Sequence, residues 1–224
     1  MIITKAKPLA EIMESLDGEK TVFLVGCSEC ATVCKTGGEE EVASMKALLE
    51  KKGKRVSGQV ILNPGCNLLE AKKEFRRNKE ELEQADSLLV MSCGGGVQIA
   101  QEASGKTVHP ANNTLFLGTV KRFGQFQEYC SMCGECLLDI TGGLCPATRC
   151  AKGLLNGPCG GAKDGKCEVD PDKDCVWIKI YERLSETGKL AALFSSDVQV
   201  HDYSVNTKPA GLVLERDVAG REGK

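Results

Sequence analysis

The sequence predicts an α/β protein: a small doubly wound parallel sheet of about four strands, then a cysteine- and glycine-rich, metal-stapled domain and a C-terminal helix. Two observations carry this prediction. Short apolar runs alternate with amphipathic stretches over residues 1–122, and eight cysteines fall between Cys130 and Cys175. Strands that alternate with helices form right-handed crossovers and a parallel sheet covered on both faces. We therefore expect an α/β domain at residues 1–122, a cysteine-rich domain at 123–198 and a tail at 199–224.

The individual elements follow from the period of the apolar residues. Strands are expected at residues 21–26, 56–62, 87–92 and 114–118, and helices at residues 8–16, 39–52, 67–83, 97–103 and 175–187. The second of these helices illustrates the pattern. Val42, Met45 and Leu49 share one of its faces, and acidic residues fill its first turn.

Composition and charge argue against several classes of partner. Hydrophobic residues make up 42% of the chain and charged residues 27%, while aromatic residues make up only 4%. With a net charge of −2, no basic tract and few rings for base stacking, no nucleic-acid partner is indicated. No stretch resembles a membrane span or a signal peptide. We expect a cytoplasmic protein, in which thirteen cysteines indicate metal binding rather than disulfides.

Five cysteines follow the predicted strands of the first domain. Cys27, Cys30 and Cys34 follow the first strand, Cys66 follows the second and Cys93 follows the third. In an open α/β sheet these strand ends share one edge, and a 2-1-3-4 strand order would bring the thiols into one pocket. A [4Fe–4S] cluster takes four cysteines; we expect Cys93 to complete the set begun by the first three, with Cys66 as the alternative. A phosphate-binding loop fits less well, because it needs N–H groups rather than thiols.

The second domain carries eight more cysteines separated by glycines, which permit the sharp bends that convergent ligands require. They are Cys130, Cys133, Cys136, Cys145, Cys150, Cys159, Cys167 and Cys175. A C-x2-C-x2-C run and a later Cys-Pro are ingredients of [4Fe–4S] ligation. Structural zinc sites typically use two separated C-x2–4-C pairs, so the overlapping run favours a cluster. Three assignments stay open for this domain: two clusters, one cluster with a four-cysteine zinc site, or zinc alone.

No catalytic constellation accompanies these cysteines. The sequence offers no Ser/His/Asp or Cys/His pairing, no paired-carboxylate motif and no Gly-x-Gly-x-x-Gly dinucleotide fingerprint. The chain is also too short for a (β/α)8 barrel beside the cysteine-rich domain. We therefore expect an electron carrier that serves another subunit, without catalytic residues of its own.

Dense motifs between residues 129 and 184 resemble the methylenetetrahydrofolate reductase C-terminal domain family. They are Tyr129-Cys-Ser-Met-Cys-Gly-Glu-Cys136, Thr141-Gly-Gly-Leu-Cys-Pro146, Arg149-Cys-Ala-Lys-Gly-Leu-Leu-Asn-Gly-Pro-Cys-Gly-Gly161, Gly165-Lys-Cys-Glu-Val169, and the segment from Cys175 to Leu184. With Gly26-Cys-Ser-Glu-Cys-Ala-Thr-Val-Cys-Lys-Thr-Gly-Gly38 ahead of them, the whole chain is similar to MetV-type small subunits.

This resemblance implies a partner and a pathway. Such small subunits pair with a MetF-type catalytic subunit, a barrel whose FMN or FAD serves the reduction of methylenetetrahydrofolate to methyltetrahydrofolate in one-carbon metabolism such as the Wood–Ljungdahl pathway. The implied role is electron supply or a structural one, and the cysteines at positions 130 to 175 carry over as cluster or zinc ligands. From the cysteines themselves we expect two or three [4Fe–4S] clusters on this chain, supplied with electrons by ferredoxin or another redox subunit. The resemblance places neither folate nor flavin here.

Two alternatives belong to other classes. A zinc-binding module could scaffold the flavin subunit without a redox role, and it would equally depend on metal for its fold. A methyl or corrinoid carrier is the weaker alternative, because His109 and His201 are the only histidines and neither has a ligand spacing.

Overall fold

A computed structural model describes residues 1–194 and 200–206 of the chain. The chain divides into two compact units, Met1–Gln127 and Glu128–Lys224. Most of the tail expected at residues 199–224 lies outside the described residues.

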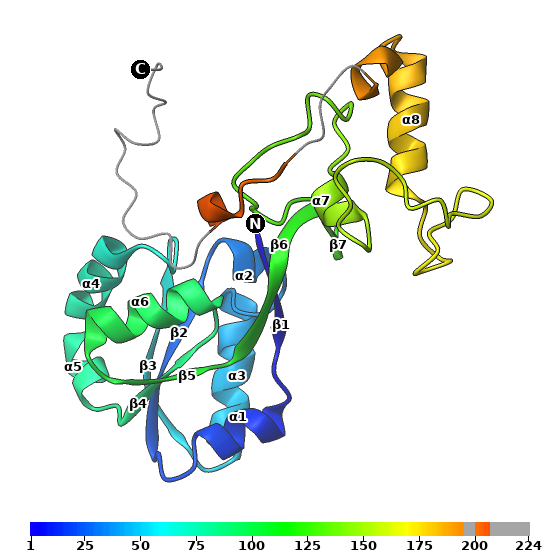
Figure 1. The fold of residues 1–224 in the computed structure, drawn as a ribbon. Helices are drawn as coiled ribbons and strands as arrows, with labels where there is room; N and C mark the ends of the chain where they lie inside the picture. Colours follow the sequence, from blue (N-terminus) through cyan, green and yellow to red (C-terminus); the bar gives the residue numbers. More distant parts are fainter. Residues whose placement is uncertain (195–199, 207–224) are drawn as a thin grey trace, which may run out of the picture. The chain divides into compact units, whose positions relative to one another are not determined.

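The first unit contains seven strands and six helices within its described residues. In chain order they are β1 (Ile2–Ala6), α1 (Leu9–Ser15), β2 (Thr21–Cys27), α2 (Cys30–Val33), α3 (Glu39–Lys51), β3 (Arg55–Leu62), α4 (Leu68–Arg77), α5 (Lys79–Glu83), β4 (Ser87–Val90), α6 (Gly94–Ser104), β5 (Thr107–Pro110), β6 (Asn112–Arg122) and β7 (Gln125–Glu128). Figure 1 labels most of them.

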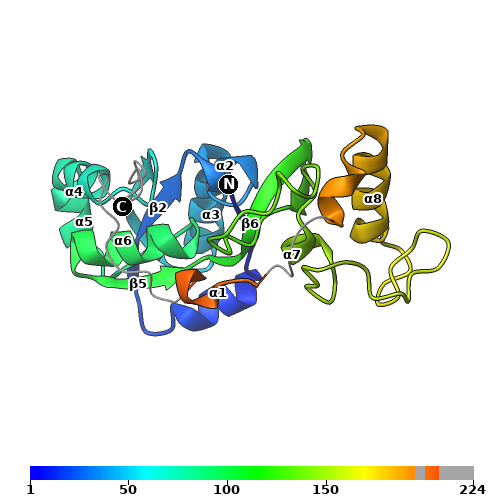
Figure 2. The ribbon, with the colours of Figure 1, turned by 45° about the horizontal axis from the view of Figure 1, so that its top comes forward.

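A four-stranded parallel sheet forms the centre of this unit. Its order is β3-β2-β4-β5, so the first predicted strand lies between the second and the third. The α/β class and the order of these three predicted strands are confirmed. In the register, Val25 of β2 pairs with Val60 of β3 on one side and Val90 of β4 on the other. Helices α1 and α3 cover one face of the sheet, and α4, α5 and α6 cover the other (Figures 1 and 2).

The two faces of the sheet bury two separate apolar clusters, because alternate side chains of a strand point to opposite faces. Phe23 and Val25 pack in the cluster that includes Phe75 of α4. Val22 and Leu24 pack in the cluster that includes Leu49 of α3. Continuous apolar strands are thus explained by burial on both sides.

Two predictions about elements are wrong, and strand β1 was missed. The fourth parallel strand is β5, not residues 114–118; the latter lie in β6, which pairs antiparallel with β1 and β7 in a second, three-stranded sheet. Strand β1 was not predicted, since its pairing with β6 joins distant parts of the chain. The helix expected at 67–83 is two helices, because the Asn78 side chain donates to the Glu74 carbonyl at 2.8 Å and ends α4.

The second unit has little regular structure within its described residues. It contains α7 (Pro146–Arg149), α8 (Val176–Glu186) and two short 3-10 helices, Leu190–Leu193 and Tyr203–Asn206. Helix α8 confirms the helix expected at 175–187. The buried part of its core consists of Val176, Trp177, Ile180 and Leu184, with Cys150 and Cys175 packed against it. The buried apolar core of this unit is therefore small, and two of its cysteines are part of the packing around it.

None of the helices in the described part of the chain is long and apolar enough to cross a membrane.

The carboxylate of Asp86 ties β2 to the start of β4. The backbone N–H groups of Thr21 and Lys20 each donate to Asp86 Oδ2 at 2.8 Å, and these bonds hold the pKa of Asp86 below its usual value. The stabilisation is therefore present above the unfolded-state pKa of about 3.9 and is lost as pH falls through the lowered folded value. We expect Asp86→Asn to unfold at lower urea than wild type at pH 6, with the difference shrinking toward pH 3. Substitution of the exposed Asp17 by Asn is the control, and a difference independent of pH would contradict this account.

Candidate metal centres

The carboxyl ends of the parallel strands carry cysteines of the first unit. Cys27 is the last residue of β2, and Cys93 is the N-cap of α6, three residues after the end of β4. A Cβ atom built on Gly95 would lie 3.8 Å from the Cβ of Cys66 and 3.8 Å from the Sγ of Cys93, so both cysteines flank the start of α6. Thiolates at this position face the positive end of an eleven-residue helix.

The Cys66 thiol responds to three other cysteines. Partial burial raises its pKa, and nearby Cys93, then Cys27 and Cys30, raise it further. The backbone N–H of Gly65, the residue before Cys66, donates to Cys27 Sγ at 3.4 Å. With the contacts at Gly95, this places Cys27, Cys66 and Cys93 near one another although they come from three strand ends, and Cys30 is close enough to act on the Cys66 pKa.

Cys34 has a different surrounding. Its Sγ lies 3.8 Å from the carbonyl oxygen of Ile2, while the backbone N–H of Ile2 donates to the Sγ of Cys30 at 3.4 Å. Cys30, the first residue of α2, and Cys34, its C-cap, thus both contact Ile2 of strand β1. Cys30 is also close enough to Cys66 to act on its pKa. Cys30 connects the two groups of contacts.

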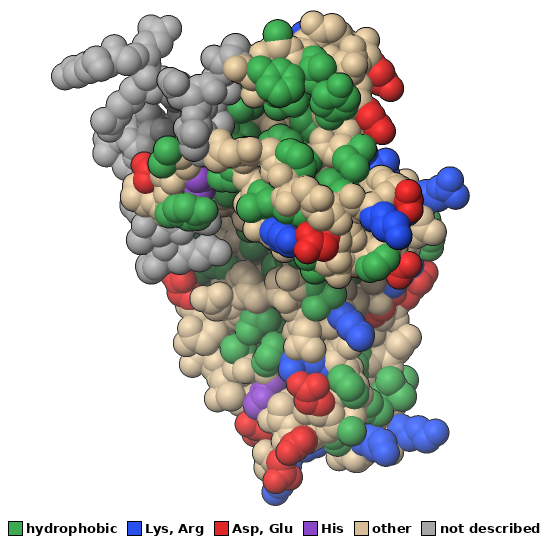
Figure 3. Space-filling model, turned by 45° about the vertical axis from the view of Figure 1, so that its right-hand side comes forward, with side chains coloured by type: hydrophobic (Ala, Val, Ile, Leu, Met, Phe, Trp, Pro, Cys, Tyr) green, Lys and Arg blue, Asp and Glu red, His purple; other side chains and the backbone are tan. Residues whose placement is uncertain are grey.

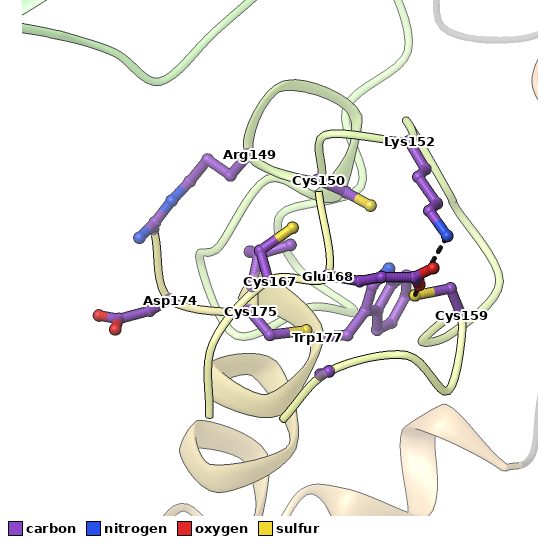
Figure 4. Close-up of a pocket in the computed structure, with 11 residues that line it drawn as sticks. Arg149, Cys150, Lys152, Cys159, Cys167, Glu168, Asp174, Cys175 and Trp177 are labelled. Atoms are coloured by element: carbon purple, nitrogen blue, oxygen red, sulfur yellow. Dashed lines mark hydrogen bonds and ion pairs between the residues drawn. The ribbon is translucent and has the colours of Figure 1, made fainter. Parts of the chain in front are cut away.

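Four cysteines of the second unit line one small pocket. They are Cys150, Cys159, Cys167 and Cys175, with Trp177 at the base (Figure 4). Backbone bonds fix two of them: the Cys167 N–H donates to the Lys173 carbonyl at 2.9 Å, and the Cys175 N–H donates to the Gly165 carbonyl at 2.8 Å. The spacing of the eight cysteines in the second unit does not show which of them lie together, whereas the pocket separates these four from the other four.

An ion pair borders this pocket. Lys152 Nζ lies 2.7 Å from Glu168 Oε2, and the Cys159 thiol donates to the same oxygen at 3.3 Å (Figure 4). The Lys152 hydrogen bond, followed by that of Cys159, holds the pKa of Glu168 below its usual value. Glu168 belongs to no catalytic or metal-ligand motif, so the sequence alone does not point to it.

The other four cysteines lie on loops outside this pocket. The Met132 N–H donates to Cys130 Sγ at 3.4 Å, and Cys133 Sγ donates to the Glu135 carbonyl at 3.2 Å. Cys145 is the N-cap of α7, directly before Pro146, and Cys136 is exposed. Met132 and Gly134 have positive φ values of 57° and 86°, so the run turns sharply between its cysteines.

Residues of the C-terminal segment contact this loop. Nδ1 of His201 lies 2.8 Å from Oε2 of Glu135, and the Asp202 N–H donates to the same oxygen at 3.0 Å. The side chain of His201 is 7% exposed. This contact joins residues far apart in the chain, and no spacing rule could have found it.

Within the described residues no group of three or more His, Cys, Asp or Glu side chains is close enough to hold a metal as it stands. The donor chemistry nevertheless fits cysteine-ligated metal. All thirteen cysteines are free thiols, four interact at the strand ends, and four line one pocket. Soft thiolates suit [4Fe–4S] clusters and zinc, and the set contains four cysteines in each case.

The face drawn in Figure 3 shows acidic and basic side chains interspersed, without a large patch of one sign. This distribution agrees with the net charge of −2.

Taken together, the fold and the thiols define an α/β protein with a cysteine-rich C-terminal unit. Residues 109–204, from β5 onward, match the family model described as methylene-tetrahydrofolate reductase C terminal. The match covers the cysteine motifs of residues 129–184 and agrees with their resemblance to that family. Neither the curated proteins nor the solved structures that were searched gave a match to the chain.

Proposed function

We propose that the protein is the iron–sulfur, electron-transfer small subunit, of MetV type, of a two-subunit methylenetetrahydrofolate reductase. It delivers electrons from ferredoxin or another redox subunit to the flavin of a MetF-type catalytic subunit, which reduces 5,10-methylenetetrahydrofolate. The observation that carries the proposal is the grouping of free cysteines by fours in a chain with a reductase C-terminal domain.

We assign the strand-end ligands to Cys27, Cys30, Cys66 and Cys93. This choice differs from the sequence-based preference for Cys34, because the Cys34 thiol lies against the Ile2 carbonyl while Cys66 interacts with the other three. A bound [4Fe–4S] cluster would supply one-electron transfer there. The protein's part is to bring together thiols from three strand ends at the start of α6, where N–H groups favour negative charge.

For the second unit we assign the pocket cysteines to one site and the loop cysteines to another. The pocket set is Cys150, Cys159, Cys167 and Cys175, and the loop set is Cys130, Cys133, Cys136 and Cys145. The Lys152 ammonium would stabilise an anionic group in the pocket, because it and the Cys159 thiol both contact the Glu168 carboxylate.

A zinc-stapled scaffold is the second candidate, and one observation favours it for the pocket. Cys150 and Cys175 pack directly against the small apolar core around α8, so metal there would hold the unit's fold together. Zinc in this pocket is compatible with iron–sulfur clusters elsewhere, whereas zinc in all sites is not compatible with electron transfer.

Rapid mixing of the reduced chain with an oxidised flavin subunit tests the proposal. We expect the visible absorption of the chain to recover as the flavin becomes reduced, and we expect flavin reduction by ferredoxin to require this chain. If ferredoxin reduces the flavin equally fast in its absence, the electron-transfer role is wrong. A chain that binds the flavin subunit without any redox change would support the scaffold.

A further inference from the structure

A buried asparagine, Asn112, contacts two cysteine-bearing segments of the first unit, the one after β2 and the one after β4. Asn112 is the first residue of β6 and is 5% exposed. The N–H of the preceding Ala111 donates to the carbonyl of Val90, the last residue of β4, at 3.0 Å. The chain therefore passes from the parallel sheet into the second sheet at the edge where the strand-end cysteines lie.

The side-chain amide of Asn112 joins two loops. Its Nδ2 donates to the carbonyl of Thr36 at 3.2 Å and to the carbonyl of Ser92 at 3.3 Å. Thr36 lies two residues after Cys34, and Ser92 directly precedes Cys93. Its Oδ1 is buried and has no hydrogen-bond partner among the described residues. Burying an unpartnered amide oxygen is costly, so the two donated bonds must offset that cost.

The two loops also touch through their backbones. A Cβ atom on Gly37 would lie 1.7 Å from the Met91 carbonyl oxygen, so only glycine permits this approach. The Cys27 N–H donates to the carbonyl of Gly37 at 2.8 Å. Backbone contact sets how closely the loops can approach, and the Asn112 amide holds them at that separation.

We infer that Asn112 is a positioning residue for the strand-end site, because it fixes Cys93 relative to the loop that carries Cys27 and Cys30. This inference rests on the proposed function for its metal. Aspartate at this position cannot donate to the two carbonyls, and its negative carboxylate would be repelled by the partial negative charge of their oxygens. Leucine has a similar volume and leaves both carbonyls without this donor.

The test compares Asn112→Leu and Asn112→Asp with the same changes at Asn113, an exposed neighbour on the same strand. The full-length chains are reconstituted anaerobically with iron and sulfide. We expect the Asn112 variants to lose about four iron atoms per chain, the content of one cluster, with the signal of one cluster missing from the electron paramagnetic resonance spectrum. Both Asn113 variants should match wild type. Unchanged iron and spectrum in the Asn112 variants would overturn the inference.

A second substitution separates positioning from general destabilisation. On a Cys93→Ser background, Asn112→Leu should cause no further loss of iron, because both changes act on one site. An additive loss would show that Asn112 acts elsewhere and would overturn the inference.

A metal-free readout separates this inference from the proposed function. In the metal-free chain, Asn112→Leu should speed alkylation of the buried Cys27 by iodoacetamide several-fold, while Cys175 reacts as in wild type. A wild-type chain that takes up no iron would refute the proposed function, yet faster Cys27 alkylation would still support the role of Asn112. Equal alkylation rates would refute that role.

Discussion

Cys93→Ser is expected to remove the strand-end cluster and with it the physiological supply of electrons. The side chain lies at the start of α6 and interacts with Cys66, so serine there leaves a [4Fe–4S] core one thiolate short. The variant should lose about four iron atoms per chain. Electron transfer from ferredoxin to the flavin subunit should fall by at least about tenfold, which corresponds to about 1.4 kcal/mol in the barrier.

Cys34→Ser is the matched control for this prediction. Cys34 lies in the segment that carries Cys27 and Cys30, but its thiol contacts the Ile2 carbonyl. The iron content and electron transfer of the Cys34→Ser chain should therefore stay near wild type. Cys66→Ser should behave like Cys93→Ser. If Cys34→Ser loses iron while Cys66→Ser keeps it, the ligand assignment reverts to the set preferred from sequence.

The same variant tests how the two units divide their roles. We propose that the strand-end site faces the electron donor and that the cysteine-rich unit contacts the flavin subunit. Cys93→Ser should then still bind the flavin subunit, and an artificial dye that reduces the flavin directly should still drive the folate reaction. If the substitution abolishes association, the first unit is the docking surface and the direction of the relay is reversed.

Removing the pocket metal is expected to unfold most of the second unit. The four buried core side chains contribute roughly 1.5–3 kcal/mol each. Ordering the surrounding loops costs roughly 1–2 kcal/mol per residue, so the core alone cannot hold this unit together. Cys175→Ser should therefore expose α8, with amide exchange of Ile180 accelerated by at least about a hundredfold, equivalent to about 2.7 kcal/mol of lost protection.

Val169→Ala, a change at an exposed position of the same loop region, is the control and should leave exchange unchanged. A strong chelator added to the wild-type chain should reproduce the effect of Cys175→Ser in the second unit and leave amide exchange in β2 slow. If α8 stays protected in the metal-free chain, the pocket cysteines have no structural role.

The parallel sheet could be predicted from the sequence because its signals are local. Apolar runs such as residues 21–25 end in glycine or cysteine, and amphipathic helices separate them. The strand order then placed Cys27 between the loops of Cys66 and Cys93, as the structure has it. The pairing of Ile2–Ala6 with β6 has no local signal, because antiparallel partners so distant are chosen by tertiary packing.

The sequence predicts thiols as candidate metal ligands, but it does not predict how the fold groups them. Cysteine spacing does not say that Cys150 and Cys159 line one pocket while Cys145 lies outside it. Residues that act through a tertiary contact, such as Asn112 and Glu168, carry no motif. Their roles follow only from which carbonyls and thiols the fold brings to them.

The metal content of the chain purified without oxygen tests the central claim most directly. Iron, acid-labile sulfide and zinc are measured per chain, and the visible spectrum is recorded before and after reduction. The account predicts at least about eight iron and eight sulfide per chain for two clusters, with visible absorption that bleaches on reduction. Stoichiometric zinc with negligible iron and no bleaching would contradict it.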